Sequence, residues 1–518
     1  MSKRLTLDIG MRFYHLPPQT DTNQTIAGFN PTLYNRANAP MLYMPIIDPS
    51  GKRVAVDPRT GALYANPLIG QYITGTGSVS NGAAIGGQNG YPGGLYTTSA
   101  MNLGPRLGFA WDVFGTGKTA VRGGFGMFKD RLQGNPTMDT NGNPPVSFAP
   151  TLYYGSLDTY ASSGGAIGPS TINNLVGFNQ PATTVNWSFG IQQQIENMAI
   201  EASYVGSAAY HLIAQKDINP IPIGAHFNTA FQDPSQPGKP LADNFLRPYY
   251  GWGSINTRSN GYNSNYHSLQ VSAQRRFSGG LQLGVAYTFY KALDVADGDT
   301  SAVSQYFSPR FRNYGRAGFD RPQQFVANYV YSLPKVGTRL NFRPAKFVLD
   351  GWEVSGVTSF ISGAPFNPGL GWTNTQDPTG SAEGARVNIV GPCQGNGTHT
   401  FFQWFNTGMA AAPAVGAWGN PNVTMANFGN MGGGNQCTGP GINNWDLSIT
   451  KRFPLFREGR FLQFRTEMFN APNHTQYSGV STGTSFNAAT GAQTSPTYGQ
   501  INNSRSGRTI ALSMRISF

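Results

Sequence analysis

Twelve segments of the chain, each 9 to 13 residues long, alternate apolar with polar or small side chains, and this alternation restricts the possible folds. Successive side chains of a β-strand point to opposite faces, so each segment predicts a strand with one apolar face. The last segment shows the pattern most plainly, with Ile510, Leu512, Met514, Ile516 and Phe518 on one face and Thr509, Ala511, Ser513, Arg515 and Ser517 on the other. The twelve predicted strands are 5–14, 105–114, 119–128, 184–195, 198–206, 266–276, 281–290, 322–333, 349–361, 444–453, 461–470 and 508–518.

The lengths of these segments favour a membrane. Strands of globular proteins have about 5 or 6 residues, whereas a tilted strand that crosses a bilayer needs about 9 to 11. Charged residues also keep to one face, because a Lys or Arg facing lipid at mid-membrane costs roughly 2 to 4 kcal/mol. The segment 322–333 departs from this rule, since Val326 and Val330 lie on the face opposite its aromatic residues. We expect that face to contact something inside the fold.

The connections alternate strictly between long and short along the chain. The long ones are 15–104, 129–183, 207–265, 291–321, 362–443 and 471–507, and the short ones are 115–118, 196–197, 277–280, 334–348 and 454–460. Membrane barrels whose strands run up and down alternately have long loops outside the cell and short turns in the periplasm. The sequence therefore predicts an all-β, antiparallel transmembrane barrel with about twelve strands here. The alternative is a large soluble β-sandwich or propeller, which does not require strands of this length.

Composition excludes several other classes. No apolar run approaches the roughly 18 residues of a membrane helix. The formal charge is +12, but the basic residues are scattered along the chain with no run of five or more, so we expect no nucleic-acid partner. The basic start MSKRLTLDIG lacks a long apolar stretch, so either an export signal lies upstream of Met1 or the chain is not exported.

The chain offers little catalytic chemistry. Gly-x-Ser-x-Gly, phosphate-loop and HExxH motifs are missing, and the six histidines are not at metal-ligand spacings. We therefore expect no enzyme activity, no metal and no cofactor. Arg465 and Glu467 share the polar face of one strand, where an ion pair that stabilises the barrel is a better interpretation than a solute contact. Cys393 and Cys437 lie in one long loop and could form a disulfide in an oxidising environment.

Several motifs resemble the C-terminal barrel of the TonB-dependent receptors, and within them the Oar-like group. They are GPRLGFAWDVFGTGKTAVRGGFGMFKDR, WSFGIQQQIENMAIEASYVGSAAYHL, YHSLQVSAQRRFSGGLQLGVAYTFYKALD, GWEVSGVTSFISGAPF, NNWDLSITKRF, FLQFRTEMFNAPNHTQY and RTIALSMRISF, in that order from about residue 104 to the end. The opening LTLDIGMRFYHLPPQTD is similar to a barrel strand of the same group.

This resemblance implies a 22-stranded barrel in the bacterial outer membrane that takes up an unidentified solute. It also implies an N-terminal plug that contacts TonB and, in the Oar-like group, a carboxypeptidase-regulatory-like domain before it. We find neither in this sequence and expect a chain truncated at its N-terminus, although a true twelve-stranded barrel stays an alternative. An adhesive or structural surface protein and a passive porin are the other functions left open.

The resemblance gives the terminal strand a further role. Met514, Ile516 and Phe518 resemble the C-terminal signal by which the outer-membrane assembly machinery recognises barrel precursors. The expected partners are therefore outer-membrane lipid, this machinery, a solute, and TonB through the N-terminal region. If 508–518 does not pair with 5–14 in a smaller barrel, it is left as an open edge, which lipid does not tolerate.

Overall fold

The structure of the chain is a computed structural model. It describes residues 4–153, 156, 158, 164–176, 180–340, 342–395, 398–434, 436–455 and 460–518. Among these residues no helix is long and apolar enough to cross a bilayer.

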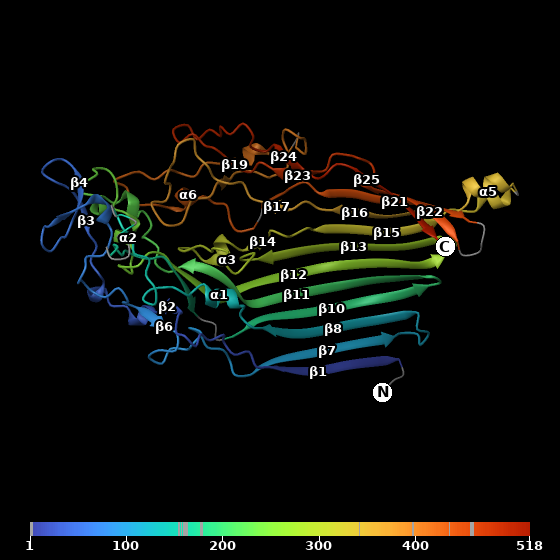
Figure 1. The fold of residues 1–518 in the computed structure, drawn as a ribbon, viewed down its shortest axis with the longest axis horizontal. Coiled ribbons are helices and arrows are strands. Elements are labelled where there is room, and N and C mark those ends of the chain that lie inside the picture. The colour runs from blue at the N-terminus through green and yellow to red at the C-terminus, as the bar shows by residue number, and fades with distance from the viewer. Residues whose placement is uncertain are drawn as a thin grey trace.

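One large antiparallel sheet dominates the structure, and its strands follow one another in chain order (Figure 1). Its twelve successive strands are β1 Leu5–Tyr14, β7 Asn102–Asp112, β8 Thr119–Asp130, β10 Ala182–Ile195, β11 Met198–Asp217, β12 Ile255–Ser278, β13 Leu281–Asp294, β15 Gln323–Ser332, β16 Trp352–Ile361, β21 Ile442–Pro454, β22 Phe461–Phe469 and β25 Thr509–Ser517. Two further strands join its long-loop end, β9 Ile172–Val176 beside β12 and β14 Gly315–Arg316 beside β13. All twelve predicted strands are thus confirmed in their predicted order.

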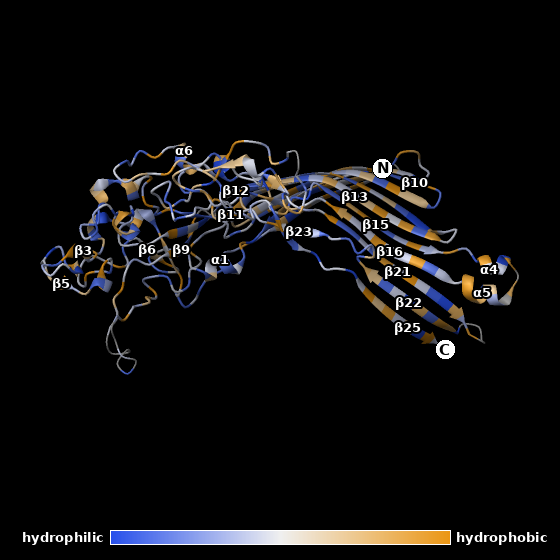
Figure 2. Ribbon diagram, turned by 90° about the horizontal axis from the view of Figure 1, so that it is seen from above, coloured by the Kyte–Doolittle hydropathy of each residue, from blue (hydrophilic) through white to orange (hydrophobic). Residues whose placement is uncertain are grey.

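The register aligns the apolar positions into one continuous face. Leu107 in β7 lies opposite Ile9 in β1 and opposite Phe125 in β8, and the same matching continues strand by strand. Many of these side chains are exposed, with Ile9 73% and Leu512 66% accessible. Figure 2 shows the alternation as orange and blue bands along each strand. We call this apolar side of the sheet its outer face.

The sheet does not close into a barrel. In the described part of the chain, β1 pairs only with β7 and β25 only with β22, so both outermost strands have a free edge. Of the two alternatives left open for 508–518, the structure has the open edge and not the pairing with 5–14. Both termini lie at the end of the sheet that carries the short turns (Figure 1).

Two strands extend about ten residues beyond their predicted bounds. β11 has 20 residues and β12 has 24, roughly twice the 9 to 11 that span a bilayer. The additional residues of β12 pair with β9 and with the end of β11, across register shifts after Ala209. The segment 255–265 is polar on both faces, so its sequence lacks the alternation that marks the other strands.

The short turns rely on local hydrogen bonds. Between β7 and β8, the Asp112 carboxylate accepts from the backbone N–H of Gly115 at 2.9 Å and of Gly117 at 2.8 Å. Both glycines have positive φ, a conformation that costs glycine little. The predicted turn 334–348 differs, because it contains two short helices, α4 Val336–Arg339 and α5 Arg343–Leu349.

The long connections pack together beyond the opposite end of the sheet (Figures 1 and 2). Their strands are β2 Ala27–Phe29, β3 Met44–Ile47, β4 Arg53–Val56, β5 Leu63–Tyr64, β6 Ala83–Ile85, β17 Pro365–Phe366, β18 Asn388–Ile389, β19 Ala410–Ala411, β20 Cys437–Thr438, β23 Tyr477–Val480 and β24 Ile501–Ser504. Their helices are α1 Gly134–Met138, α2 Asp243–Leu246, α3 Pro309–Arg312 and α6 Met425–Phe428, with 3₁₀ turns at Pro31–Leu33, Arg36–Asn38, Asn66–Leu68, Ala225–Phe227, Thr229–Phe231 and Thr407–Met409.

The buried apolar clusters lie in this loop assembly. One surrounds Phe29, Ile172, Trp252 and Ile255, which come from different long connections and the end of β12. Another brings residues of 362–443 against Phe486 and Tyr498 of 471–507. The long loops therefore support one another through packed cores of their own.

Candidate functional site

A cavity opens where four long connections leave the sheet. Its volume is about 420 Å³, within the range of about 300 to 1,000 Å³ typical of small-molecule pockets. The lining comes from 15–104, 129–183, 207–265 and 291–321, with apolar residues such as Leu16 and Ile213 and charged residues such as Asp130 and Asp299. The site therefore exists only after these loops have packed together.

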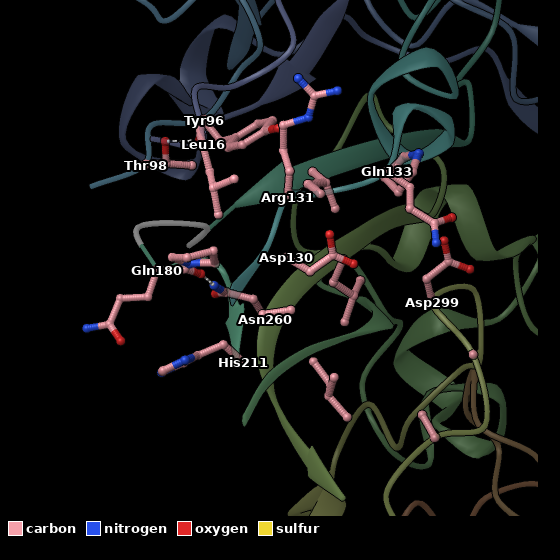
Figure 3. Close-up of a pocket in the computed structure, with 18 of the residues that line it drawn as sticks. Leu16, Tyr96, Thr98, Asp130, Arg131, Gln133, Gln180, His211, Asn260 and Asp299 are labelled. Atoms are coloured by element: carbon pink, nitrogen blue, oxygen red, sulfur yellow. Dashed lines mark hydrogen bonds between the residues drawn. The ribbon is translucent and has the colours of Figure 1, made fainter. Parts of the chain in front are cut away.

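Polar groups are distributed around the wall of this cavity (Figure 3). Gln133 and Asp299 lie near each other on one side, and His211 lies on another. Asn260 donates a hydrogen bond to the backbone carbonyl of Gln180 at 2.5 Å and thereby joins two loops. The buried Nδ1 of His211 has no hydrogen-bond partner among the described residues. The lining thus combines apolar wall with a few polar groups, as binding pockets generally do.

A second cavity of about 330 Å³ shares Asp297 and Ala296 with the first. Asp294, four residues beyond the predicted membrane segment 281–290, also lines it and is buried. Burial, and secondly the adjacent Asp297 carboxylate, raise the pKa of Asp294 to about 7. Because burial and a neighbouring like charge oppose ionisation, Asp294 gains or loses its proton near neutral pH.

A histidine in the connection 207–265 joins it to the connection 362–443, through two hydrogen bonds to carboxylates. His226 Nε2 lies 2.8 Å from Asp243 Oδ1 in α2, and His226 Nδ1 lies 2.6 Å from Asp377 Oδ2 in the connection 362–443. These hydrogen bonds raise the pKa of His226 to about 9, against the opposing effect of burial. The imidazole is therefore a cation at neutral pH, and both ring nitrogens donate.

A buried arginine joins the connection 291–321 to 362–443. Arg312 is 1% exposed and donates to the backbone carbonyls of Gly429 at 2.7 Å and Phe428 at 2.8 Å. Its Nε lies 3.5 Å from Glu383. Burial, and secondly the charge of Arg312, lower the pKa of the neighbouring Arg386 to about 10. Two guanidinium groups and one carboxylate thus stabilise the loops beside the second cavity.

The two cysteines are joined within the loop assembly. Cys393 and Cys437 form a disulfide with a Cα–Cα distance of 5.6 Å. Cys437 lies in β20 and is buried against Met409 in the same cluster as Phe405. The bond connects positions 44 residues apart within the connection 362–443.

The other predicted site residues lie far from the loop cavities in the fold. Arg465 and Glu467 form an ion pair at 2.7 Å on the polar face of β22, where Arg465 also donates to Ser448 Oγ at 2.9 Å. Met514 and Ile516 project from the outer face of β25, and Phe518 is 94% exposed at its end. The structure therefore does not gather the sequence-predicted residues into a single site.

Sequence reasoning missed the loop cavities and the groups around them. His226 and Asp377 are 151 positions apart, and nothing local marks either as a partner of the other. His267, in the YHSLQ motif, contacts the hydroxyl of Tyr204 through Nδ1 at 2.6 Å. Among the described residues no group of three or more His, Cys, Asp or Glu side chains is placed to hold a metal.

Comparison with known proteins places the chain in context. A family model described as "Outer membrane beta barrel domain" matches residues 1–511. No curated protein sequence matches the chain.

Three solved structures illustrate its similarity to other proteins. The outer membrane transporter YddB from Escherichia coli has 11% identity over 81% of this chain and 41% of its own, with a TM-score of 0.43. The siderophore receptor PirA from Acinetobacter baumannii has 12% identity over 81% and 41%, with a TM-score of 0.39. The ferric-catecholate import receptor Fiu from Escherichia coli K12 has 10% identity over 100% and 43%, with a TM-score of 0.36. The present chain spans less than half the length of each.

Proposed function

Because the chain belongs to the outer membrane beta barrel domain family and lies in the bacterial outer membrane, we propose that it forms part of the wall of an uptake receptor. In this proposal the six long connections face the outside of the cell and capture a solute. The observation that carries it is the cavity of about 420 Å³, because four separate loops must pack together to build it. The clusters around His226 and Arg312 join two of these four connections, 207–265 and 291–321, to the connection 362–443.

The free edges of the sheet support a larger barrel. Unpaired backbone groups of β1 and β25 are costly in lipid, so each edge requires another strand. We propose that ten more strands complete a 22-stranded barrel, with a plug and a TonB-binding segment in the same whole protein. The membership in the Oar-like group, suggested by the motifs, is part of this proposal.

A pair of introduced cysteines tests the barrel size. A closed twelve-stranded barrel would pair the two outermost strands, β1 and β25. Thr6 and Ser513 lie on the polar faces of these strands and would then come close together. Cysteines at Thr6, paired in turn with cysteines at Ala511, Ser513 and Arg515, are expected to give no intrachain crosslink in outer membranes. Efficient crosslinking of one pair would show that β1 and β25 are neighbours and would overturn the larger barrel.

Uptake is tested in the native host with the whole protein. Solutes lost from a defined medium are measured by mass spectrometry in wild-type cells, in cells lacking this protein and in cells lacking TonB. We expect at least one solute whose removal requires both proteins. Removal that needs this protein but not TonB would indicate a passive channel, and no difference between the strains would favour an adhesive or structural role.

A further inference from the structure

The connection between β15 and β16 exposes an unusual amount of apolar surface. It lies at the short-turn end, contains α4 and α5, and is only about 19 residues long. Its exposed large apolar side chains are Leu333, Val336, Leu340, Phe342, Phe347, Val348 and Leu349. Contiguous apolar surface of this kind generally marks a contact with a partner or a membrane.

This segment docks on the outer face of the sheet. Phe347 of α5 packs on Phe453 of β21 with ring centroids 4.9 Å apart. The indole N–H of Trp352 donates to the carbonyl of Val348 at 2.9 Å. Phe453 lies on the same apolar face of β21 as Ile449, and Trp352 lies on the same apolar face of β16 as Val354. The helix α5 therefore lies beside the lipid-facing surface.

A buried lysine explains how α5 is held there. Lys451 belongs to the outer face of β21, yet it is only 2% exposed. Its ammonium donates to the carbonyls of Val348, at 3.1 Å, and Asp350, and lies about 5 Å from the rings of Trp352 and Phe453. A charge on the lipid face is thereby covered by the end of α5, where free carbonyls attract cations.

The segment also carries exposed basic residues. Lys335, Arg339 and Lys346 are exposed. The acidic Asp350 is engaged within the segment, since it accepts from the Gly337 N–H at 2.7 Å and the Thr338 hydroxyl at 2.5 Å. Apolar and aromatic side chains combined with exposed basic residues are typical of helices that lie in a membrane interface.

From this geometry we propose that residues 335–340 and 342–349 form an interfacial anchor that binds the anionic phospholipid surface at the short-turn rim of the barrel. The apolar side chains enter the boundary between headgroups and acyl chains, and the exposed side chains of Lys335, Arg339 and Lys346 contact lipid phosphates. The segment continues the lipid-facing surface of β16 and β21, and its charge complements an anionic bilayer. It fixes the depth of this part of the barrel in the membrane.

The test places a spin label on the whole protein at single introduced cysteines. Phe347→Cys and Leu340→Cys report on the segment, and Thr116→Cys, in the exposed turn between β7 and β8 at the same end, is the matched control. Collision rates with oxygen, which concentrates in lipid, and with a water-soluble nickel chelate are measured in vesicles of phosphatidylethanolamine and phosphatidylglycerol. Positions 340 and 347 should favour oxygen, and position 116 should favour nickel.

The charge contribution is tested with Lys335→Gln, Arg339→Gln and Lys346→Gln combined. Each basic residue near an anionic surface contributes about a fivefold preference for the membrane, so this variant should increase nickel access at position 347. This increase in nickel access should be much smaller in phosphatidylcholine vesicles, because a bilayer without net charge attracts the basic residues of the unmodified segment only weakly.

Two results would overturn the proposal. One is equal nickel access at positions 347 and 116 in the anionic vesicles. The other is protection of position 347 in native outer membranes but not in pure lipid, which would assign the surface to a protein partner. Neither result bears on solute uptake, so the two proposals can fail independently.

Discussion

The joint between His226, Asp243 and Asp377 predicts that two long loops separate when the imidazole loses its proton. A histidine with its pKa at about 9 instead of 6.5 binds the proton more tightly by about 3.4 kcal/mol. The Asp243 and Asp377 side chains are 43% and 40% exposed, so solvent screening reduces this upper bound. We expect about 1 to 2 kcal/mol of loop stabilisation.

The direction with pH follows from the raised pKa of His226. The stabilisation is fully present below pH 6.5 and is lost as the pH rises from 6.5 through about 9. The joint also weakens in acid, because the His226 hydrogen bond lowers the pKa of Asp243. Burial raises the pKa of Asp377, but its hydrogen bonds outweigh burial and leave it lowered. The joint is therefore strongest between mildly acidic and neutral pH.

Hydrogen exchange read by mass spectrometry measures this effect. After correction for the intrinsic rate, peptides covering 225–246 and 374–384 should exchange roughly 5 to 30 times faster at pH 10 than at pH 6.5. His226→Gln should remove most of this pH dependence, whereas the exposed His15→Gln is the matched control. An unchanged pH dependence in His226→Gln would refute the assignment of the effect to this joint.

Three other changes are predicted from the structure. Replacing Cys393 and Cys437 with serine should destabilise the connection 362–443 by about 4 kcal/mol, because the disulfide restricts the unfolded chain across 44 positions. Peptide maps of the unreduced, unmodified protein that show two free thiols would contradict the bond. Leu512→Arg, on the outer face, should cost roughly 2 to 4 kcal/mol in urea unfolding from lipid vesicles, whereas the adjacent Ser513→Arg should cost much less. Arg312→Met should destabilise the loop assembly by about 3 to 5 kcal/mol, because it leaves Glu383 without its buried partner. If proteolysis of 362–443 is no faster in this variant than in the unmodified protein, Arg312 does not have this role.

The membrane strands were predictable because one physical constraint acts on every second residue. Lipid excludes charge from the outer face, so a strand such as 508–518 records its two faces directly in the sequence. The alternation of long and short connections then gives the order of the antiparallel strands. The end of β12 was missed because 255–265 is polar on both faces and owes its strand to pairing with β9.

The loop assembly was not predictable, because its contacts join positions far apart in the chain. Arg312 contacts the Gly429 carbonyl 117 residues away, and the two side chains that hold His226 come from different loops. Neither relation has a local signal. The helix α5 has a local sequence signal, because Pro344 lies in its first turn, as is common at helix N-termini. It was missed because 334–348 was interpreted only as a turn.

The orientation of the twelve strands is the central claim, and labelling of single cysteines in intact cells tests it most directly. Ser50→Cys and Thr490→Cys lie in long connections, and Thr116→Cys and Asn197→Cys lie in short turns; all four positions are exposed. A maleimide that cannot cross the outer membrane should label the first two in intact cells and the other two only after the membrane is opened. Labelling of the short turns in intact cells, with the long connections protected, would contradict the account.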